Sequence, residues 1–168
     1  MDGDYAFPRH VTTLEFPAHP QYAIKCGYTA ADIPSLRLVE RQCFQRGVAY
    51  SLQDFREVLA CKDTRIWIAK DKRDVHAGFL ISWLERGLPH VASVDVALAH
   101  RGHGLAGQLM DRCEAYYCGQ RHDKITLQVA TDNPAQILYF KRGYRITRYL
   151  KNQPDAGGKD ALWMEKPL

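Results

Sequence analysis

The 168-residue sequence contains no apolar run that approaches the roughly 20 residues a membrane-spanning helix requires. Its first residues, Met1-Asp-Gly-Asp-Tyr, are acidic and include no apolar signal core. These two absences argue against a membrane-spanning protein and against a secreted one. We therefore expect a cytoplasmic location and no membrane partner.

The sequence also lacks cysteines and histidines at the spacings of common metal-binding and disulfide motifs. The five cysteines, at positions 26, 43, 61, 113 and 118, form neither a Cys-x-x-Cys pair nor an even disulfide framework. The seven histidines show no His-x-x-x-His or His-Glu pairing with metal-ligand geometry. The sequence predicts buried thiols, and it predicts no metal site.

Composition is ordinary for one soluble globular domain. Hydrophobic residues make up 46% of the chain and charged residues 25%, and no linker is long enough to divide it. The net charge of +4 is mild, and it suits either solubility or an acidic partner. We expect a single domain over residues 20–168, preceded by an N-terminal extension over residues 1–19.

Periodicity predicts the element order β-α-α-β-β-β-α-β-α-β-β. Asp32 is expected to cap the first helix, with Pro34 in its first turn, and Ser51 with Asp54 resembles a capping box for the second. The strands are expected at residues 22–28, 64–71, 75–83, 91–98, 125–130, 144–150 and 161–166.

The most informative segment is Arg101-Gly102-His103-Gly104-Leu105-Ala106, which joins a strand-like run to an amphipathic, helix-like run. Its glycines let backbone N–H groups approach an anion, and the helix dipole adds positive potential at the same place. An ordinary tight turn explains the pattern about equally well. A dinucleotide fingerprint is formally met by adding Gly107, but Asp123, which stands near the expected acidic position, precedes its strand.

A second segment, Asn133-Pro-Ala-Gln-Ile-Leu-Tyr-Phe-Lys-Arg-Gly-Tyr144, decides between these interpretations. The first segment, Arg101-x-x-Gly104-x-Ala106, resembles the acetyl-CoA signature of the GNAT N-acetyltransferases, and the second resembles their other cofactor motif. Both motifs stand in the family's order and separation. The resemblance is clear from about Val91 to Leu150.

The resemblance implies an α/β (α+β) fold with a mostly antiparallel mixed sheet of six to seven strands and about four helices. The sheet would be splayed between the strands before and after the phosphate-loop helix. It also implies acetyl-CoA as co-substrate, a primary amine as acceptor and direct attack of the amine in a ternary complex. The cofactor would contact Val94, Asp95, Val96, Arg101, Gly102, His103, Gly104, Leu105, Ala106, Asn133 and Tyr139.

Tyr139 matches the tyrosine that protonates the departing thiolate in many family members, so it is the expected general acid. The same resemblance implies that the Val96 N–H donates to the carbonyl oxygen and stabilises its negative charge. His90 is the first candidate for the base, because a regular strand would place it on the same face as Val96 six residues later. Glu85 is the alternative.

The acceptor is not specified by the sequence. Arg41, Arg46 and Tyr50 fall in the region that shapes the acceptor site in relatives, and both peptide amines and small amines stay open. A non-catalytic acyl-CoA sensor or subunit is the alternative function, and a homodimer stays open too. We expect no nucleic-acid partner, because strand alternation would divide the basic residues between Lys141 and Lys151 over two faces.

Overall fold

The computed structural model describes residues 21–43 and 51–168. The expected N-terminal extension, residues 1–19, therefore lies outside the described part of the chain. Arg46 and Tyr50, two of the residues expected near the acceptor, lie outside it too.

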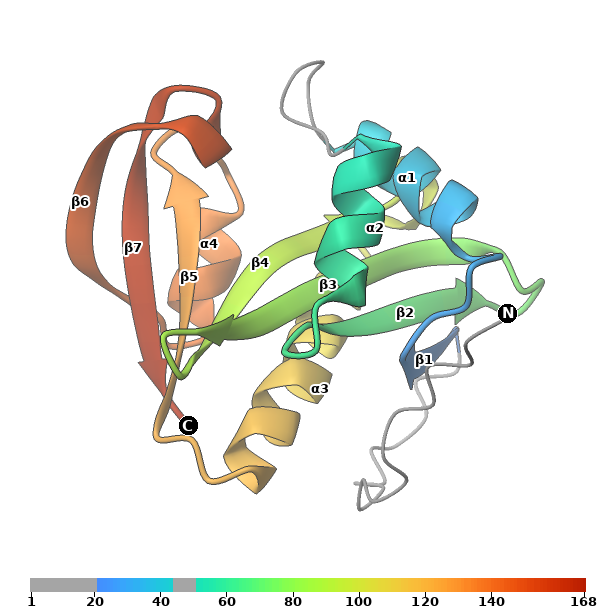
Figure 1. Ribbon diagram of the computed structural model, residues 1–168, viewed down its shortest axis with the longest axis horizontal. Coiled ribbons are helices and arrows are strands. Elements are labelled where there is room, and N and C mark those ends of the chain that lie inside the picture. Colours follow the sequence, from blue (N-terminus) through green and yellow to red (C-terminus); the bar gives the residue numbers. More distant parts are fainter. Residues whose placement is uncertain (1–20, 44–50) are drawn as a thin grey trace.

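A single seven-stranded sheet forms the centre of the fold (Figure 1). Its order is β1-β2-β3-β4-β5-β7-β6, and β4 with β5 is its only parallel pair among the described residues. The expected mixed, mostly antiparallel sheet is confirmed. The strands are β1 (Tyr22–Cys26), β2 (Arg65–Asp71), β3 (His76–Glu85), β4 (Leu88–Val96), β5 (Lys124–Ala130), β6 (Arg145–Gln153) and β7 (Lys159–Pro167).

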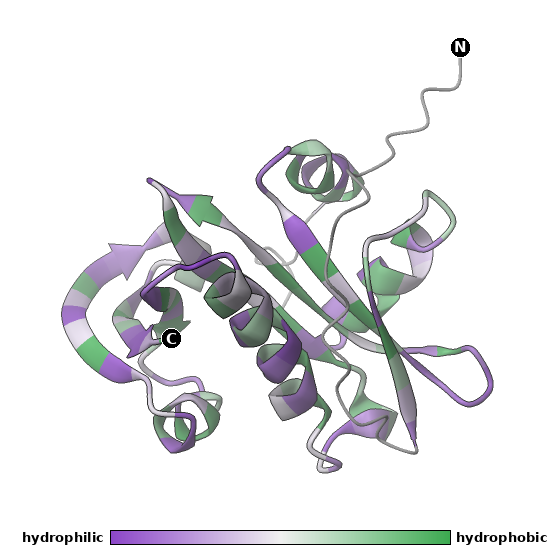
Figure 2. Ribbon diagram, turned by 90° about the horizontal axis from the view of Figure 1, so that it is seen from below, coloured by the Kyte–Doolittle hydropathy of each residue, from purple (hydrophilic) through white to green (hydrophobic). Residues whose placement is uncertain are grey.

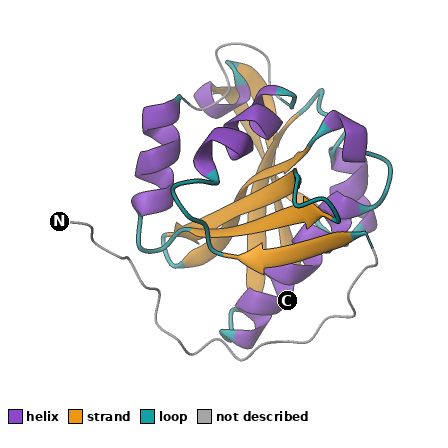
Figure 3. Cartoon of the chain, turned by 90° about the vertical axis from the view of Figure 1, so that its right-hand side faces the viewer, coloured by secondary structure: helices purple, strands orange, loops and turns teal. Residues whose placement is uncertain are grey.

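Four α-helices flank the two faces of this sheet (Figure 3). One face packs against α1 (Ile33–Arg41) and α2 (Leu52–Ala60), around a core that includes Phe55 and Phe79. The other face packs against α3 (Leu105–Gly119) and α4 (Gln136–Lys141). Hydrophobic colour follows the central strands, and hydrophilic colour gathers in the loops at their ends (Figure 2).

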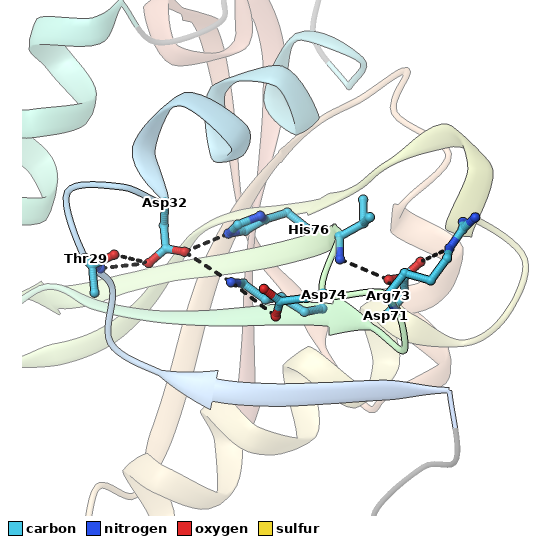
Figure 4. Close-up of polar contacts among 8 residues, drawn as sticks. Thr29, Asp32, Asp71, Arg73, Asp74 and His76 are labelled. Carbon is cyan, nitrogen blue, oxygen red and sulfur yellow. Dashed lines mark hydrogen bonds and ion pairs between the residues drawn. The ribbon is translucent and has the colours of Figure 1, made fainter.

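The Asp32 side chain holds the start of α1 in place, but it does not cap the helix as the sequence predicted. Asp32 occupies the N-cap position but caps no helix N–H. Its carboxylate accepts hydrogen bonds from the backbone N–H and hydroxyl of Thr29, and it pairs with His76 Nε2 at 2.8 Å (Figure 4). Burial favours the neutral form, but these contacts and nearby Lys70 outweigh it and lower the pKa of Asp32 to about 2. Asp32 thus ties α1 to the β2–β3 hairpin.

The second helix begins as expected. The Ser51 hydroxyl accepts from the Asp54 N–H, and the Asp54 carboxylate accepts from the Ser51 N–H, which is a complete capping box.

Strand β4 differs from the expectation in two ways. It begins at Leu88, because Arg86 and Gly87 take left-handed φ values of 51° and 82° and close a tight turn after β3. It also contains a bulge: Ser82 pairs with Val91, whereas the neighbouring Ile81 pairs with Ser93, so Ala92 is an extra residue. Because Ala92 is an extra residue, the side chains that precede it in β4 point to the opposite face of the sheet from the one that strict alternation predicts.

Gly78 lets β3 approach β4 closely beneath the start of α3. A Cβ at this position would lie 2.6 Å from the Asp95 carbonyl oxygen and 3.4 Å from Leu105 Cδ2. We predict that Gly78→Ala lowers the free energy of unfolding by about 1–3 kcal/mol, because strand backbone must shift. Urea denaturation checks this value. Gly119→Ala is the matched control: its Cβ would meet nothing within 4 Å, and an unchanged Gly78→Ala variant would contradict the prediction.

Candidate active site

The two parallel strands at the centre of the sheet separate soon after they meet. Their ladder consists of His90 opposite Thr126 and Val91 opposite Leu127. Figure 1 shows β4 and β5 diverging from this short paired region. The expected splay of the sheet is therefore confirmed, and it lies between the strands that precede and follow α3.

Two backbone amides of β4 face the splayed side. The Ala97 N–H bonds to the Ala77 carbonyl, so Val96 and its partner Gly78 form a non-hydrogen-bonded pair. The alternation of an antiparallel ladder then turns the N–H groups of Val94 and Val96 away from β3 and toward β5. An extended ligand in this opening can bond to both amides as an added strand would.

The loop before α3 presents a second group of donors. Gly102 and Gly104 take left-handed φ values of 78° and 74°, and Gly104 is the N-cap of the helix. The first hydrogen bond into the helix runs from the Gln108 N–H to the Gly104 carbonyl at 3.2 Å. Within the described residues, no acceptor is recorded for the N–H groups of residues 102–107. Together with the helix dipole, this row of donors suits a phosphate group.

Arg101, expected at the start of the phosphate loop, turns its guanidinium away from the loop amides. Its Nε donates to the Val96 carbonyl at 3.0 Å, and its Nη2 donates to the Gln42 carbonyl at 3.3 Å. The same Nη2 lies 3.3 Å from the Cys43 sulfur. Arg101 therefore fastens the end of α1 to the end of β4, and the donors that the loop presents are backbone N–H groups.

Asn133 and Tyr139 lie on the segment that follows β5. The Asn133 side chain accepts from the Ala135 N–H at 2.9 Å, so it shapes the turn just before α4 and does not cap the helix itself. Gln136 Nε2 bonds to the carbonyls of Ala130 and Thr131, which fixes α4 to the end of β5. Tyr139 is consequently held beside the strand that borders the splay.

The Tyr139 phenol is buried, with 8% of the residue exposed. Its ring lies edge-on to that of Tyr144, at a centroid distance of 5.9 Å. Burial, with a smaller effect from the charge of Asp95, raises the pKa of Tyr139 to about 12. The phenol therefore carries its proton at neutral pH, as a proton donor must.

His90 does not lie on the face predicted for it. The bulge at Ala92 breaks the alternation that the prediction assumed, and His90 shares its face with Ser93 and Asp95, opposite to Val96. It also pairs with β5 at the closed end of the splay, roughly 18 Å of strand from Val96. His90 and Val96 are therefore not brought together.

The surroundings of His90 fix its tautomer. Thr126 Oγ1 donates to the Pro89 carbonyl at 3.0 Å, so it accepts from His90 Nδ1 at 2.9 Å. Glu85 Oε2 lies 3.6 Å from the same nitrogen. The structure thus places the two base candidates side by side, with His90 buried and Glu85 partly exposed.

Sequence reasoning missed an aromatic row across this face. The His90 ring stacks on Trp163 at 4.9 Å and lies 5.9 Å from Trp83. The Arg148 guanidinium carbon lies 4.4 Å from the Trp163 ring centroid. Small Thr126 on β5 lets the rings from β4 and β7 meet above it. The row bridges the two halves of the sheet where they separate, and only the sheet register could have revealed it.

Asp95 is the other feature that the sequence did not show. Its side chain is fully buried on the α1 and α2 face, because it pairs with Phe79 of that core. Ser93 Oγ donates to Oδ2, whereas Oδ1 has no hydrogen-bond partner. Burial raises the pKa of Asp95 to about 6, against the opposing effects of Ser93, Cys43 and Arg101.

This carboxyl group gives a testable pH dependence of stability. Its folded pKa of about 6 lies above the ordinary 3.8, so its ionisation destabilises the fold. The penalty is absent below about pH 4, develops between pH 4 and 6, and reaches about 3 kcal/mol above pH 6. We predict that Asp95→Asn gains stability relative to the wild type by this amount across that range, measured by urea denaturation. A difference that does not change with pH would contradict the prediction.

The chain belongs to the GNAT acetyltransferase family. Residues 62–146 match the family described as the acetyltransferase (GNAT) domain, and these 85 residues are just over half of the 168. The match covers β2 to the start of β6, including the phosphate loop and α4. The class of the protein is therefore an acetyltransferase, as expected. No curated protein matches the chain in sequence.

Solved structures share the fold at low sequence identity. The ribosomal-protein-S18-alanine N-acetyltransferase from Escherichia coli has a TM-score of 0.73 and 18% identity, over 87% of this chain and 93% of that one. Ard1 from Thermoplasma volcanium has a TM-score of 0.73 and 19% identity, over 88% and 97%. The spermidine/spermine N-acetyltransferase SpeG from Vibrio cholerae has a TM-score of 0.67 and 17% identity, over 88% and 92%.

Among residues 21–43 and 51–168, no helix is both long enough and apolar enough to span a membrane.

Proposed function

We propose that the protein transfers an acetyl group from acetyl-CoA to a primary amine by direct attack in a ternary complex. The single observation that carries this proposal is the opening between β4 and β5. It has the N–H groups of Val94 and Val96 along one side and Tyr139 beside the other, with the loop 102–107 at the end of β4.

The cofactor would extend from the loop into this opening. The amides of Gly102, His103, Gly104, Leu105 and Ala106 would hold the pyrophosphate, and the backbone from Val94 to Val96 would bond to the pantetheine arm. Asn133 would support the cofactor by shaping the turn before α4. Arg101 would contribute by position, since its guanidinium is bonded to the Val96 and Gln42 carbonyls.

Three devices would then promote acyl transfer. The Val96 N–H would stabilise the negative charge that attack places on the carbonyl oxygen. Tyr139 would give its proton to the departing thiolate. His90 on β4 and Glu85 at the end of β3 stand as the proposed bases from the sequence. Both lie at the closed end of the splay, far from Val96, so protons would reach them only through water.

The acceptor is an amine of a protein or of a small molecule. The S18-alanine enzyme is named for a protein acceptor and SpeG for polyamines, and this chain resembles both folds to a similar degree. The test is release of CoA thiol from acetyl-CoA with N-terminal peptides, lysine peptides, polyamines, amino acids and aminoglycosides. Release with one class supports the proposal and names the acceptor. No release with any of them, while acetyl-CoA still raises the melting temperature, favours a non-catalytic acyl-CoA sensor.

Tyr139→Phe tests the proton donor. We predict that it lowers kcat on the order of 10²-fold while leaving acetyl-CoA affinity unchanged, because only the phenolic proton is lost. Steady-state kinetics and calorimetric binding measure the two quantities. Tyr116→Phe, on the outer part of α3 beside Arg65, is the control and should keep full activity. Unchanged kcat in Tyr139→Phe would remove the residue from this role.

Gly104→Glu tests the phosphate loop. The change places a negative side chain at the N-cap of α3 and strains a residue with φ of 74°, so acetyl-CoA binding should be lost. Gly87→Glu is the matched control, because Gly87 has a similar φ of 82° in the turn before β4, far from the loop. Calorimetric titration with acetyl-CoA compares them. Normal affinity in Gly104→Glu would refute the assignment.

A further inference from the structure

We propose that Asp95 contacts the acceptor directly: its unpartnered Oδ1 binds the ammonium group of the incoming amine and takes one proton from it. This inference rests on the proposed function and gives a catalytic role in that site to a residue that the sequence analysis listed among the cofactor contacts.

One oxygen of the buried Asp95 carboxyl group lacks a hydrogen-bond partner. The Asp95 side chain is 0% exposed, and Oδ1 is among the buried polar atoms with no hydrogen bond. A buried carboxylate oxygen without a partner costs stability. The Arg101 guanidinium does not relieve it, because it is bonded to Val96, Gln42 and Cys43. The Cys43 thiol lies close enough to lower the pKa of Asp95, but it donates to the Val39 and Val96 carbonyls. A ligand that carries a positive charge and N–H donors would satisfy this oxygen.

Asp95 also lies next to the proposed site of acyl transfer. Asp95 immediately precedes Val96, whose N–H faces the splay and is the proposed donor to the thioester carbonyl. Its side chain lies on the α1 and α2 face, whereas Tyr139 belongs to the core on the α3 and α4 face. An amine that attacks from the first face would displace a thiolate toward the second. The proposed proton acceptor and the proposed proton donor therefore flank the reacting carbon from opposite sides.

The groups around Asp95 set the basicity of its carboxyl group. Ser93 Oγ bonds to the carboxyl group from β4, and the Cys43 thiol at the end of α1 and Arg101 before α3 act on it as well. From the other face of the sheet, the Tyr139 phenol on α4 is influenced by the charge of Asp95. Burial is the largest influence and raises the pKa of Asp95 to about 6. The group is then ionised at neutral pH yet more basic than an ordinary carboxylate, which suits a proton acceptor.

The proton and electron balance is complete. One proton passes from the ammonium nitrogen to Asp95 Oδ1, and the freed lone pair forms the C–N bond to the thioester carbon. The C–S bond breaks, and the thiolate takes the Tyr139 proton. Loss of the second nitrogen proton restores Tyr139, and Asp95 releases its proton to solvent. The products are an amide, free CoA thiol and one proton.

Asp95→Asn is the decisive variant, studied in the full chain with the best amine acceptor from the thiol-release panel. For the wild type, kcat/KM should rise with pH through a limb near pH 6. In Asp95→Asn, kcat/KM at pH 7.5 should fall on the order of 10²–10⁴-fold, and the limb should disappear. Activity should then increase about tenfold per pH unit, following the free amine. Acetyl-CoA affinity should be unchanged.

Ser93→Ala separates catalysis from structure. It removes the hydrogen bond to Oδ2, so it should raise the pKa of Asp95 and move the limb to higher pH while keeping most of the plateau activity. A limb that stays near pH 6 in this variant would contradict the assignment, as would an Asp95→Asn variant with wild-type kcat/KM and profile. Loss of activity in His90→Gln with none in Asp95→Asn would transfer the role to His90.

The wild type in the same assay distinguishes the two proposals. Wild-type turnover together with an undiminished Asp95→Asn variant would refute the role of Asp95 and leave the proposed function intact. A wild type that releases no CoA with any amine would refute the proposed function and, with it, this assignment.

Discussion

The shortness of the ladder between β4 and β5 is the constraint on which the rest of the structure depends. Two residue pairs hold these strands together, and beyond them the amides of Val94 and Val96 have no strand to bond to. Backbone groups left in this state are costly inside a protein, so the fold keeps them only where something else can bond to them. Everything in the site is arranged around that opening, including the loop at the end of β4 and α4 at the end of β5.

The halves of the sheet are therefore joined by side chains as much as by backbone. His90 stacks between Trp83 and Trp163 above Thr126, and the row continues to Arg148 on the edge strand. On the α1 side, Arg101 joins the Val96 carbonyl to the end of α1. These contacts let the strands separate without loosening the fold. His90 and Arg101 therefore have structural roles that a comparison of sequence motifs does not reveal.

The sequence predicted the element order, the glycine loop that opens α3 and the splay, because these depend on local periodicity and on two motifs with fixed spacing. It misplaced His90, because a bulge at Ala92 is an insertion in register that strand alternation cannot detect. It also mistook Asp32 for a helix cap, since the true partners, Thr29 and His76, are set by how α1 meets the β2–β3 hairpin. The lack of a partner for Asp95 Oδ1 could not be predicted either, because it depends on which polar groups of the folded protein come within hydrogen-bonding distance.

The most direct test of the account is an amide-resolved NMR titration of the full chain with acetyl-CoA. The account predicts that the largest shift changes and the strongest new protection from hydrogen exchange occur at Val94, at Val96 and in the loop 102–107. The amides of β1 and of the β2–β3 hairpin should stay unchanged. Binding that leaves Val94, Val96 and the loop unaffected while it perturbs amides elsewhere would contradict the central claim that the splayed strand and the loop form the cofactor site.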